Sequence, residues 1–335
     1  MKNKKMNKNY LSAGVAAVLG GAMMFASPVA ADSLPINYDD LSFVEEPLAL
    51  DVGVGTLSFS ALADQAVTHE FNGNETTTYD TVAKAQFNFE TELPNSMTLA
   101  MQYVGTFTRL ADDEITETYA LSIADSWGTI AVGEVAGLVK ERTRRGRGVG
   151  NASLANDDFL GGLEAESAFY GVRVNSFQAS LAVDRDGQGA IGLSFEQPVS
   201  QGSVFTAVRL QKGDTNDGTT SGGKGDSYGG VIVGGYSYGS FSIDGQIGYE
   251  RIDLEASGND NNNTFASVGA KYKYGVYSVS LDLGGGVTDG DTRHAASLGF
   301  RADMFRGASF NAGLNHSNAF GSRSTKVKGS IRYEF

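Results

Sequence analysis

The chain has 335 residues, with 44 glycines, five prolines and no cysteine, and its 39 acidic residues outnumber 26 basic ones to give a net charge of −13. This acidic balance argues against a nucleic-acid partner, whose phosphates bind an excess of lysine and arginine. Abundant glycine with little proline suits many strands joined by tight turns better than a helical domain. Without cysteine, an exported chain must be held by backbone pairing and packing rather than by disulfides.

Residues 1–31 have the features of a secretory signal peptide. Four lysines precede an apolar run at residues 11–26, and small residues at 29–31 provide a cleavage-like site. A membrane-spanning helix is the alternative, but it needs about 20 apolar residues and this run is shorter. Subtracting the four lysines from 26 basic residues leaves 22 against 39 acidic ones, so the exported chain carries a net charge of −17.

Residues 32–52 form an acidic, irregular segment that contains Asp39, Asp40, Glu45 and Glu46. Apolar and polar residues alternate too weakly here to predict a strand. We interpret the segment as an N-terminal extension whose path the sequence does not define.

From residue 53 to the end, apolar and polar residues alternate with period two. In the last segment Val327, Ile331, Tyr333 and Phe335 share one face while the other face is charged or polar. The same pattern predicts sixteen strands, at residues 53–63, 80–91, 96–107, 117–125, 128–135, 167–175, 177–185, 190–197, 202–212, 227–237, 240–253, 264–274, 277–287, 293–303, 308–317 and 325–335.

A soluble sandwich would show the same alternation, since its strands also bury one face. Two features favour a membrane barrel instead: aromatic residues recur near strand ends on the apolar face, and the connections alternate in length. Those after even-numbered strands are short, as at 175–176 and 274–275, whereas most of the others are long and polar, as at 213–226 and 255–263. Because lipid offers no partner for a sheet edge, the strands must close. We therefore predict an all-β, transmembrane, antiparallel 16-stranded barrel around a water-filled lumen.

The connection at about 135–166 is far longer than the others, and such segments are usually functional or disordered. Its first half is basic and its second half acidic. We predict that it folds into the lumen and forms a charged constriction from Lys140, Arg142, Arg144, Arg145, Arg147, Asp157 and Asp158. Two alternatives stay open: the arginines only pin the segment to carboxylates of the wall, or they lie exposed outside the barrel.

Alternation also assigns charged residues to the inner wall. The predicted basic pore-lining residues are Lys84, Arg173, Arg209, Lys271, Arg301, Lys326, Lys328 and Arg332. The predicted acidic ones are Glu90, Asp184, Glu196, Asp244, Glu250, Asp282 and Asp303.

Three stretches resemble the general diffusion porins of Gram-negative outer membranes. WGTIAVG at 127–133 is similar to the strand before the family's third loop, residues 157–159 and 169–171 are similar to its return, and Phe335 with Tyr333 is similar to the signal read by the barrel-assembly machinery. The resemblance implies a homotrimer of sixteen-stranded barrels with an inward third loop, in contact with outer-membrane lipid and lipopolysaccharide. The chain departs from the family in carrying its arginines on the loop and in having Glu134 where a base is common.

Other chemistries find little support in the sequence. His69, His294 and His316 stand in no nucleophile motif, with His69 expected in an outer loop, so we predict no enzyme. Residues 214–218 resemble a calcium loop, but its acids are misplaced and the glutamate at its twelfth position is absent, so no metal or other cofactor is expected.

The sequence thus predicts an outer-membrane porin for passive diffusion of ions and small hydrophilic solutes, with a preference for anionic or zwitterionic ones. One alternative is a channel selective for an organic anion or a sugar. The other is a structural or adhesion barrel whose third loop plugs the lumen.

Overall fold

The computed structural model describes residues 48–71, 75–109, 113–146, 148–154, 160–163, 166–217, 223–254, 260–305, 307–319 and 322–334. The predicted signal peptide and residues 32–47 of the predicted extension lie outside these ranges. Among the described residues, no helix has the length and apolarity needed to cross a membrane, a finding that concerns helices alone.

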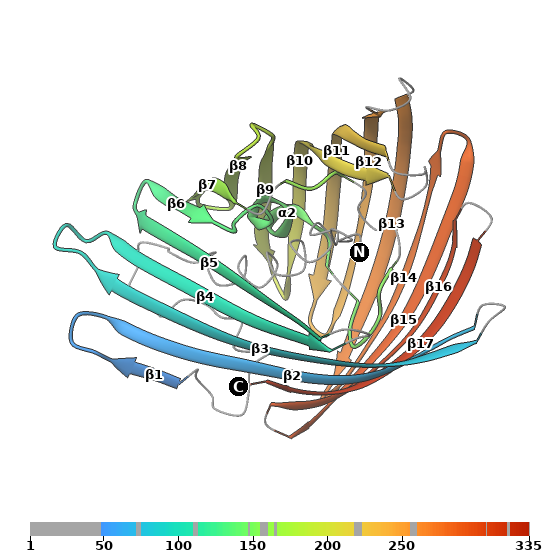
Figure 1. Cartoon of the computed structure of the whole chain (residues 1–335), viewed down its shortest axis with the longest axis horizontal. Helices are drawn as coiled ribbons and strands as arrows, with labels where there is room; N and C mark the ends of the chain where they lie inside the picture. The colour runs from blue at the N-terminus through green and yellow to red at the C-terminus, as the bar shows by residue number, and fades with distance from the viewer. Residues whose placement is uncertain are drawn as a thin grey trace, which may run out of the picture.

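The predicted closed, antiparallel barrel of sixteen strands is confirmed (Figure 1). Each strand pairs with its neighbours in the chain, and the last pairs with the first through nine residue pairs, from Lys326↔Glu70 to Glu334↔Leu62. The sixteen strands are β2 Thr56–Glu70, β3 Thr76–Glu92, β4 Thr98–Arg109, β5 Asp113–Asp125, β6 Gly128–Gly133, β7 Ser167–Val174, β8 Phe177–Asp184, β9 Gly189–Val199, β10 Gly202–Asp217, β11 Gly223–Tyr238, β12 Phe241–Leu254, β13 Asp260–Tyr274, β14 Tyr277–Thr288, β15 Asp291–Phe305, β16 Ala308–Ala319 and β17 Ser322–Glu334.

A seventeenth, short strand, β1 (Leu48–Asp51), completes the seam of the barrel. It pairs with the start of β2, from Leu48↔Phe59 to Asp51↔Thr56, beyond the point where β17 ends opposite Leu62. The expectation of an irregular segment is therefore wrong at residues 48–51. A strand of four residues is too short to show a period of two in the sequence. The part of β2 with which it pairs is left open only because β17 ends opposite Leu62.

The two faces of each strand differ as the period of two predicts. Along β14, the side chains of Ser278, Ser280 and Asp282 are buried, while Val279 and Leu281 between them are exposed on the outside. The outer positions form the apolar surface that lipid requires, where an arginine or lysine at mid-depth would cost about 2–4 kcal/mol. Polar side chains consequently collect on the inner face of the barrel.

The long connections at one end of the barrel are shorter than predicted. Residues 213–217 continue β10 and residues 223–226 begin β11, with Asp214 opposite Asp226, so the predicted loop at 213–226 and its calcium-like run are largely strand. Likewise, β13 begins at Asp260 rather than at 264. Polar residues in these stretches pair as ladders, because a strand that continues beyond the lipid no longer needs an apolar face.

Candidate functional site

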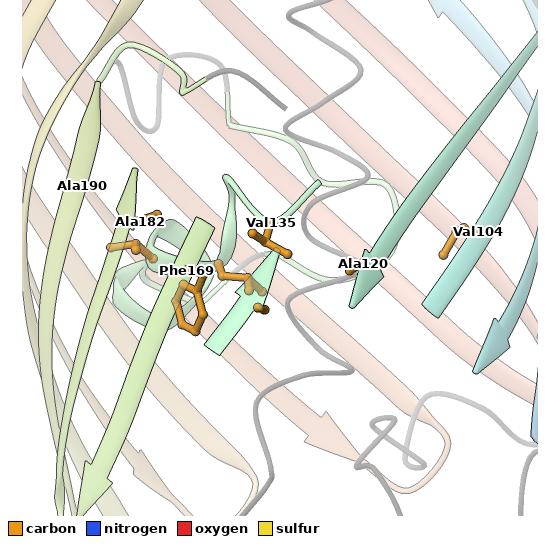
Figure 2. Close-up of a cluster of buried hydrophobic side chains, with 9 residues drawn as sticks. Val104, Ala120, Val135, Phe169, Ala182 and Ala190 are labelled. Atoms are coloured by element: carbon orange, nitrogen blue, oxygen red, sulfur yellow. The ribbon is translucent and has the colours of Figure 1, made fainter. Parts of the chain in front are cut away.

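The segment between β6 and β7, residues 134–166, is called loop 3 below. It begins with a short helix, α2 (Leu138–Thr143), which packs against β8, β9 and β10 (Figure 1). Val135, Leu138 and Val139 are fully buried in a cluster that includes Phe169 and Ala182 (Figure 2). Their i, i+3, i+4 spacing places them on one side of the chain, so loop 3 is anchored by apolar packing where it leaves the wall.

Small residues on the wall make room for this helix. A Cβ atom at Gly192 would lie 2.7 Å from the side chain of Thr143 and 2.9 Å from that of Val139, and one at Gly171 would collide with the guanidinium of Arg142. Sequence reasoning missed these positions. The sequence feature that could have identified them is a glycine at an inward-facing position of a strand whose outward-facing residues are apolar.

Arg142 projects from α2 and is buried without an acidic partner among the described residues. The residue is 6% exposed, its guanidinium carbon lies 4.6 Å from the ring centre of Phe169, and its Nε has no hydrogen-bond partner in the part of the chain that the structure describes. It forms no ion pair with any described residue. Burial lowers the pKa of Arg142 to about 10, so the group keeps its positive charge at neutral pH.

Arg145, three residues further on, has the opposite surroundings. It is 3% exposed, and its Nη1 lies 3.0 Å from Asp244 Oδ1 on β12 and 2.8 Å from Asp282 Oδ1 on β14. Between these two arginines, Arg144 pairs with Glu141 at 2.5 Å. Arg145 therefore fixes loop 3 to the inner wall, and its charge is compensated there.

Beyond Arg145, loop 3 forms hydrogen bonds with inward-facing residues of β14 and β17. Val149 N donates to Ser280 Oγ at 2.8 Å, and Asn151 Nδ2 donates to Ser330 Oγ at 3.1 Å. The returning part lies against β10 to β12, where Gly161 N donates to Glu250 Oε1 at 2.9 Å. Loop 3 thus contacts inward-facing groups on β8–β12, β14, β16 and β17.

Several predicted constriction residues can be placed and others cannot. Lys140, Arg142, Arg144 and Arg145 lie on α2 or just after it. Arg147, Asp157 and Asp158 lie outside the described residues, as does Phe335 of the predicted assembly signal. Tyr333 lies on β17, opposite Ala63 and Ala308.

A cavity of about 420 Å³ lies beside α2. It is lined by residues of the loop and by residues of β7 to β10. Its charged groups are Glu141, Arg142, Arg144, Arg145, Arg173 and Glu196. Arg173 donates its Nε to the carbonyl of Asn175 at 3.3 Å, and neither Arg173 nor Glu196 forms an ion pair with a described residue. The structure therefore brings together three arginines of loop 3 and one predicted wall arginine with a predicted wall acid.

Other predicted pore-lining bases pair with acids of the wall. Arg332 lies 2.8 Å from Asp64 Oδ2, and Lys326 lies 3.3 Å from Glu70 Oε2. Three further predicted pore-lining bases lie on the strand faces that also carry buried polar residues. They are Lys84, Arg209 and Lys271, of which Arg209 is fully buried. Two more pairs are Lys328 with Asp80 at 4.0 Å and Arg301 with Asp303 at 2.7 Å. Sequence reasoning missed Asp64, Glu70 and Asp80. Strand register places Asp64 opposite Arg332 and Glu70 opposite Lys326, whereas Asp80 lies on β3, one strand beyond the strand that pairs with Lys328.

The stem of loop 3 carries two acids. Burial and the charge of Glu166 raise the pKa of Glu134 above its ordinary value. Glu166 itself lies 3.9 Å from Arg185. The stem is therefore sensitive to the ionisation of Glu134.

The histidines lie on strands. His69 is in β2 rather than in an outer loop, which corrects the expectation, and its Nδ1 lies 2.9 Å from Thr77 Oγ1. His316 Nδ1 lies 2.8 Å from Thr325 Oγ1, and its ring is 6.2 Å from that of His294.

A closed sixteen-stranded barrel with an apolar outside and a polar inside is the fold of the outer-membrane porins. No family model and no curated protein matches this sequence. Solved structures do match in fold. An anion-selective porin from Comamonas acidovorans has a TM-score of 0.62 at 14% identity, covering 84% of this chain and 100% of that one.

Two further solved structures match in fold. The trimer form of OmpT, an outer membrane protein of Vibrio cholerae, has a TM-score of 0.63 at 14% identity, covering 84% of this chain and 100% of that one. OccK2 of Pseudomonas aeruginosa in complex with glucuronate has a TM-score of 0.58 at 12% identity, covering 89% of this chain and 98% of that one. Identities this low show a shared fold.

Proposed function

We propose that this chain is an outer-membrane porin through which ions and small hydrophilic solutes diffuse passively, past a constriction formed by loop 3. The observation that carries the proposal is the path of loop 3. Apolar packing holds it at β8–β10, Arg145 bonds to β12 and β14, and Asn151 bonds to β17. A segment with anchors so far apart on the inner wall occupies part of the bore and leaves a narrower passage beside it.

The charges of this passage favour anions in our proposal. Arg145 and Arg144 have acidic partners, whereas Arg142 and Arg173 have none among the described residues. Unpaired positive charge between low-dielectric walls raises the local concentration of anions, and charged rings in a pore sort the ions that pass. We therefore infer a preference for anionic or zwitterionic solutes despite the acidic net charge of the chain.

The setting of the channel is also part of the proposal. We infer that residues 1–31 direct export, that Phe335 and Tyr333 act in recognition by the barrel-assembly machinery, and that the barrel lies in the outer membrane of a Gram-negative bacterium against lipid and lipopolysaccharide. A homotrimer is supported by the trimer form of OmpT, which has the same fold. The anion-selective porin with this fold supports the proposed ion preference.

Single-channel recording tests this function. The refolded protein in a planar bilayer should give discrete current steps, and liposomes that contain it should swell with sugars at rates that decline smoothly as the sugar grows. Absent steps would contradict the proposal and favour a plugged barrel. A swelling rate that is high for one sugar alone would contradict simple sieving.

A second candidate is a channel selective for an organic anion. The specific observation in its favour is that Arg142 is buried beside a cavity without an acidic partner among the described residues. The glucuronate complex of OccK2, which shares the fold, supports it.

A further inference from the structure

The cavity beside α2 contains positive charges that no described residue compensates. Arg142 is 6% exposed and forms no ion pair with a described residue, and its Nε lacks a hydrogen-bond partner. A buried charge is costly unless it is paired and hydrogen-bonded. The ring of Phe169, 4.6 Å away, compensates only part of this cost. An anion in the cavity would provide the negative charge and the hydrogen-bond acceptors that the guanidinium of Arg142 lacks among the described residues.

A second guanidinium, that of Arg173 on β7, opens onto the same cavity. It bonds through Nε to the carbonyl of Asn175, which leaves its Nη groups without an acidic partner among the described residues. Two guanidiniums in one cavity can bind a carboxylate through parallel, charge-assisted hydrogen bonds. The other two arginines of the cavity, Arg144 and Arg145, are already engaged by carboxylates.

The cavity also contains features that restrict the charge and size of the ligand. Glu196 lines it and forms no ion pair with a described residue, so a doubly charged anion would be repelled where a singly charged one is tolerated. Ser194 and Gln178 offer neutral hydrogen-bonding groups. A volume of about 420 Å³ lies at the small end of ordinary ligand sites, roughly 300–1,000 Å³.

We propose that this cavity is a binding site for small, singly charged carboxylates, with Arg142 and Arg173 holding the carboxylate. The site deepens the proposed porin function, on which it rests: a carboxylate would pause beside α2 before it crosses the bore. It also accounts for an arginine that would otherwise be buried at a cost.

Binding of radiolabelled propionate, measured by equilibrium dialysis on the full exported chain in detergent, tests the site. The wild type should bind propionate saturably. Arg142→Gln should weaken binding about tenfold or more, because the charge-assisted hydrogen bond between the guanidinium and the carboxylate of propionate is lost at a buried position. Arg173→Gln, at the exposed mouth of the cavity, should weaken it in the same direction without disturbing the packing of α2.

Arg251→Gln is the matched control. It removes the same charge from an exposed position on β12 that pairs with Asp253 and lines no part of the cavity, so binding should equal that of the wild type. Acetate should displace propionate, and sulfate at equal concentration should displace it far less. The proposal would be overturned if the wild type showed no saturable binding, or if both cavity variants bound propionate as tightly as the wild type. It would also be overturned if sulfate displaced propionate as well as acetate does.

The same preparation separates this inference from the proposed function. Current steps in a planar bilayer without propionate binding would leave the porin standing and remove the site. Binding without current steps would remove the porin and, with it, the transport role of the site.

Discussion

The first half of loop 3 has two regions that the barrel holds by different means. The helical segment, residues 138–144, is anchored by buried apolar side chains and presents Arg142 without an acidic partner among the described residues. The segment that follows, described at residues 145–146 and 148–153 and containing a turn, is anchored by ion pairs and hydrogen bonds from Arg145, Val149 and Asn151 to the wall. Apolar anchoring leaves Arg142 without an acidic partner among the described residues, whereas the charge of Arg145 is compensated by the two aspartates that hold the loop.

The strongest test removes the polar anchor. The double substitution Asp244→Asn and Asp282→Asn strips both carboxylates from the buried Arg145. Breaking a buried ion pair costs about 3–5 kcal/mol, so we expect the free energy of unfolding in urea to fall by about that amount and the single-channel current to become larger and noisier. Asp303→Asn is the control, because its pair with Arg301 is partly exposed and should contribute about 0–1 kcal/mol. Unchanged stability in the double variant would show that Arg145 is not an anchor.

The apolar anchor should be nearly as sensitive. Leu138→Ala empties part of a fully buried site on α2, and such truncations cost about 2–5 kcal/mol. Hydrogen exchange should accelerate in residues 135–144 more than in 145–153. Uniform acceleration over both segments would mean that they open together and that the two anchors are not independent.

Ion selectivity should respond to one arginine more than to the other. Arg142→Gln removes a charge that has no acidic partner among the described residues, whereas Arg145→Gln removes one that two aspartates offset. In a KCl gradient, the reversal potential should therefore shift toward cation preference in Arg142→Gln. In Arg145→Gln the reversal potential should shift less, and any shift should accompany a loss of stability, because loop 3 is displaced. A larger shift in Arg145→Gln at unchanged stability would contradict the assignment.

The smallest effect concerns pH. Burial and Glu166 raise the pKa of Glu134, so the ionised form is disfavoured in the folded stem. The stem should become more stable as the pH falls from neutral toward the ordinary glutamate value of 4.5, and less stable as it rises. Hydrogen exchange at residues 134–136 should show this dependence in the wild type and lose it in Glu134→Gln. A dependence that persists in the variant would place its origin elsewhere.

The barrel was predictable because lipid imposes a simple rule on every strand. Outward residues such as Val279, Leu281 and Ile331 must be apolar, so the period of two is visible in the sequence alone. The ends of the strands were not predictable to the same degree. Where β10 and β11 continue through Asp214 and Asp226, polar residues pair in a ladder that composition cannot distinguish from a loop.

The site was predictable only as a set of charges. Sequence placed Arg142 and Arg145 on the same loop, but their different surroundings depend on which wall residues face them after closure. Phe169 and Asp282 are far apart in the chain, and their roles follow from strand register. The small residues that admit α2, Gly171 and Gly192, gain meaning only when the helix lies against them.

Thiol labelling of loop 3 during single-channel recording tests the central claim, that loop 3 narrows the conducting bore. The chain has no cysteine, so Arg144→Cys, which lines the cavity beside α2, introduces one target, and Arg251→Cys on the outer face of β12 provides the control. A methanethiosulfonate reagent bearing a trimethylammonium group should reduce the current of Arg144→Cys in discrete steps and leave that of Arg251→Cys unchanged. Complete labelling of Arg144→Cys without any change in current would contradict the account.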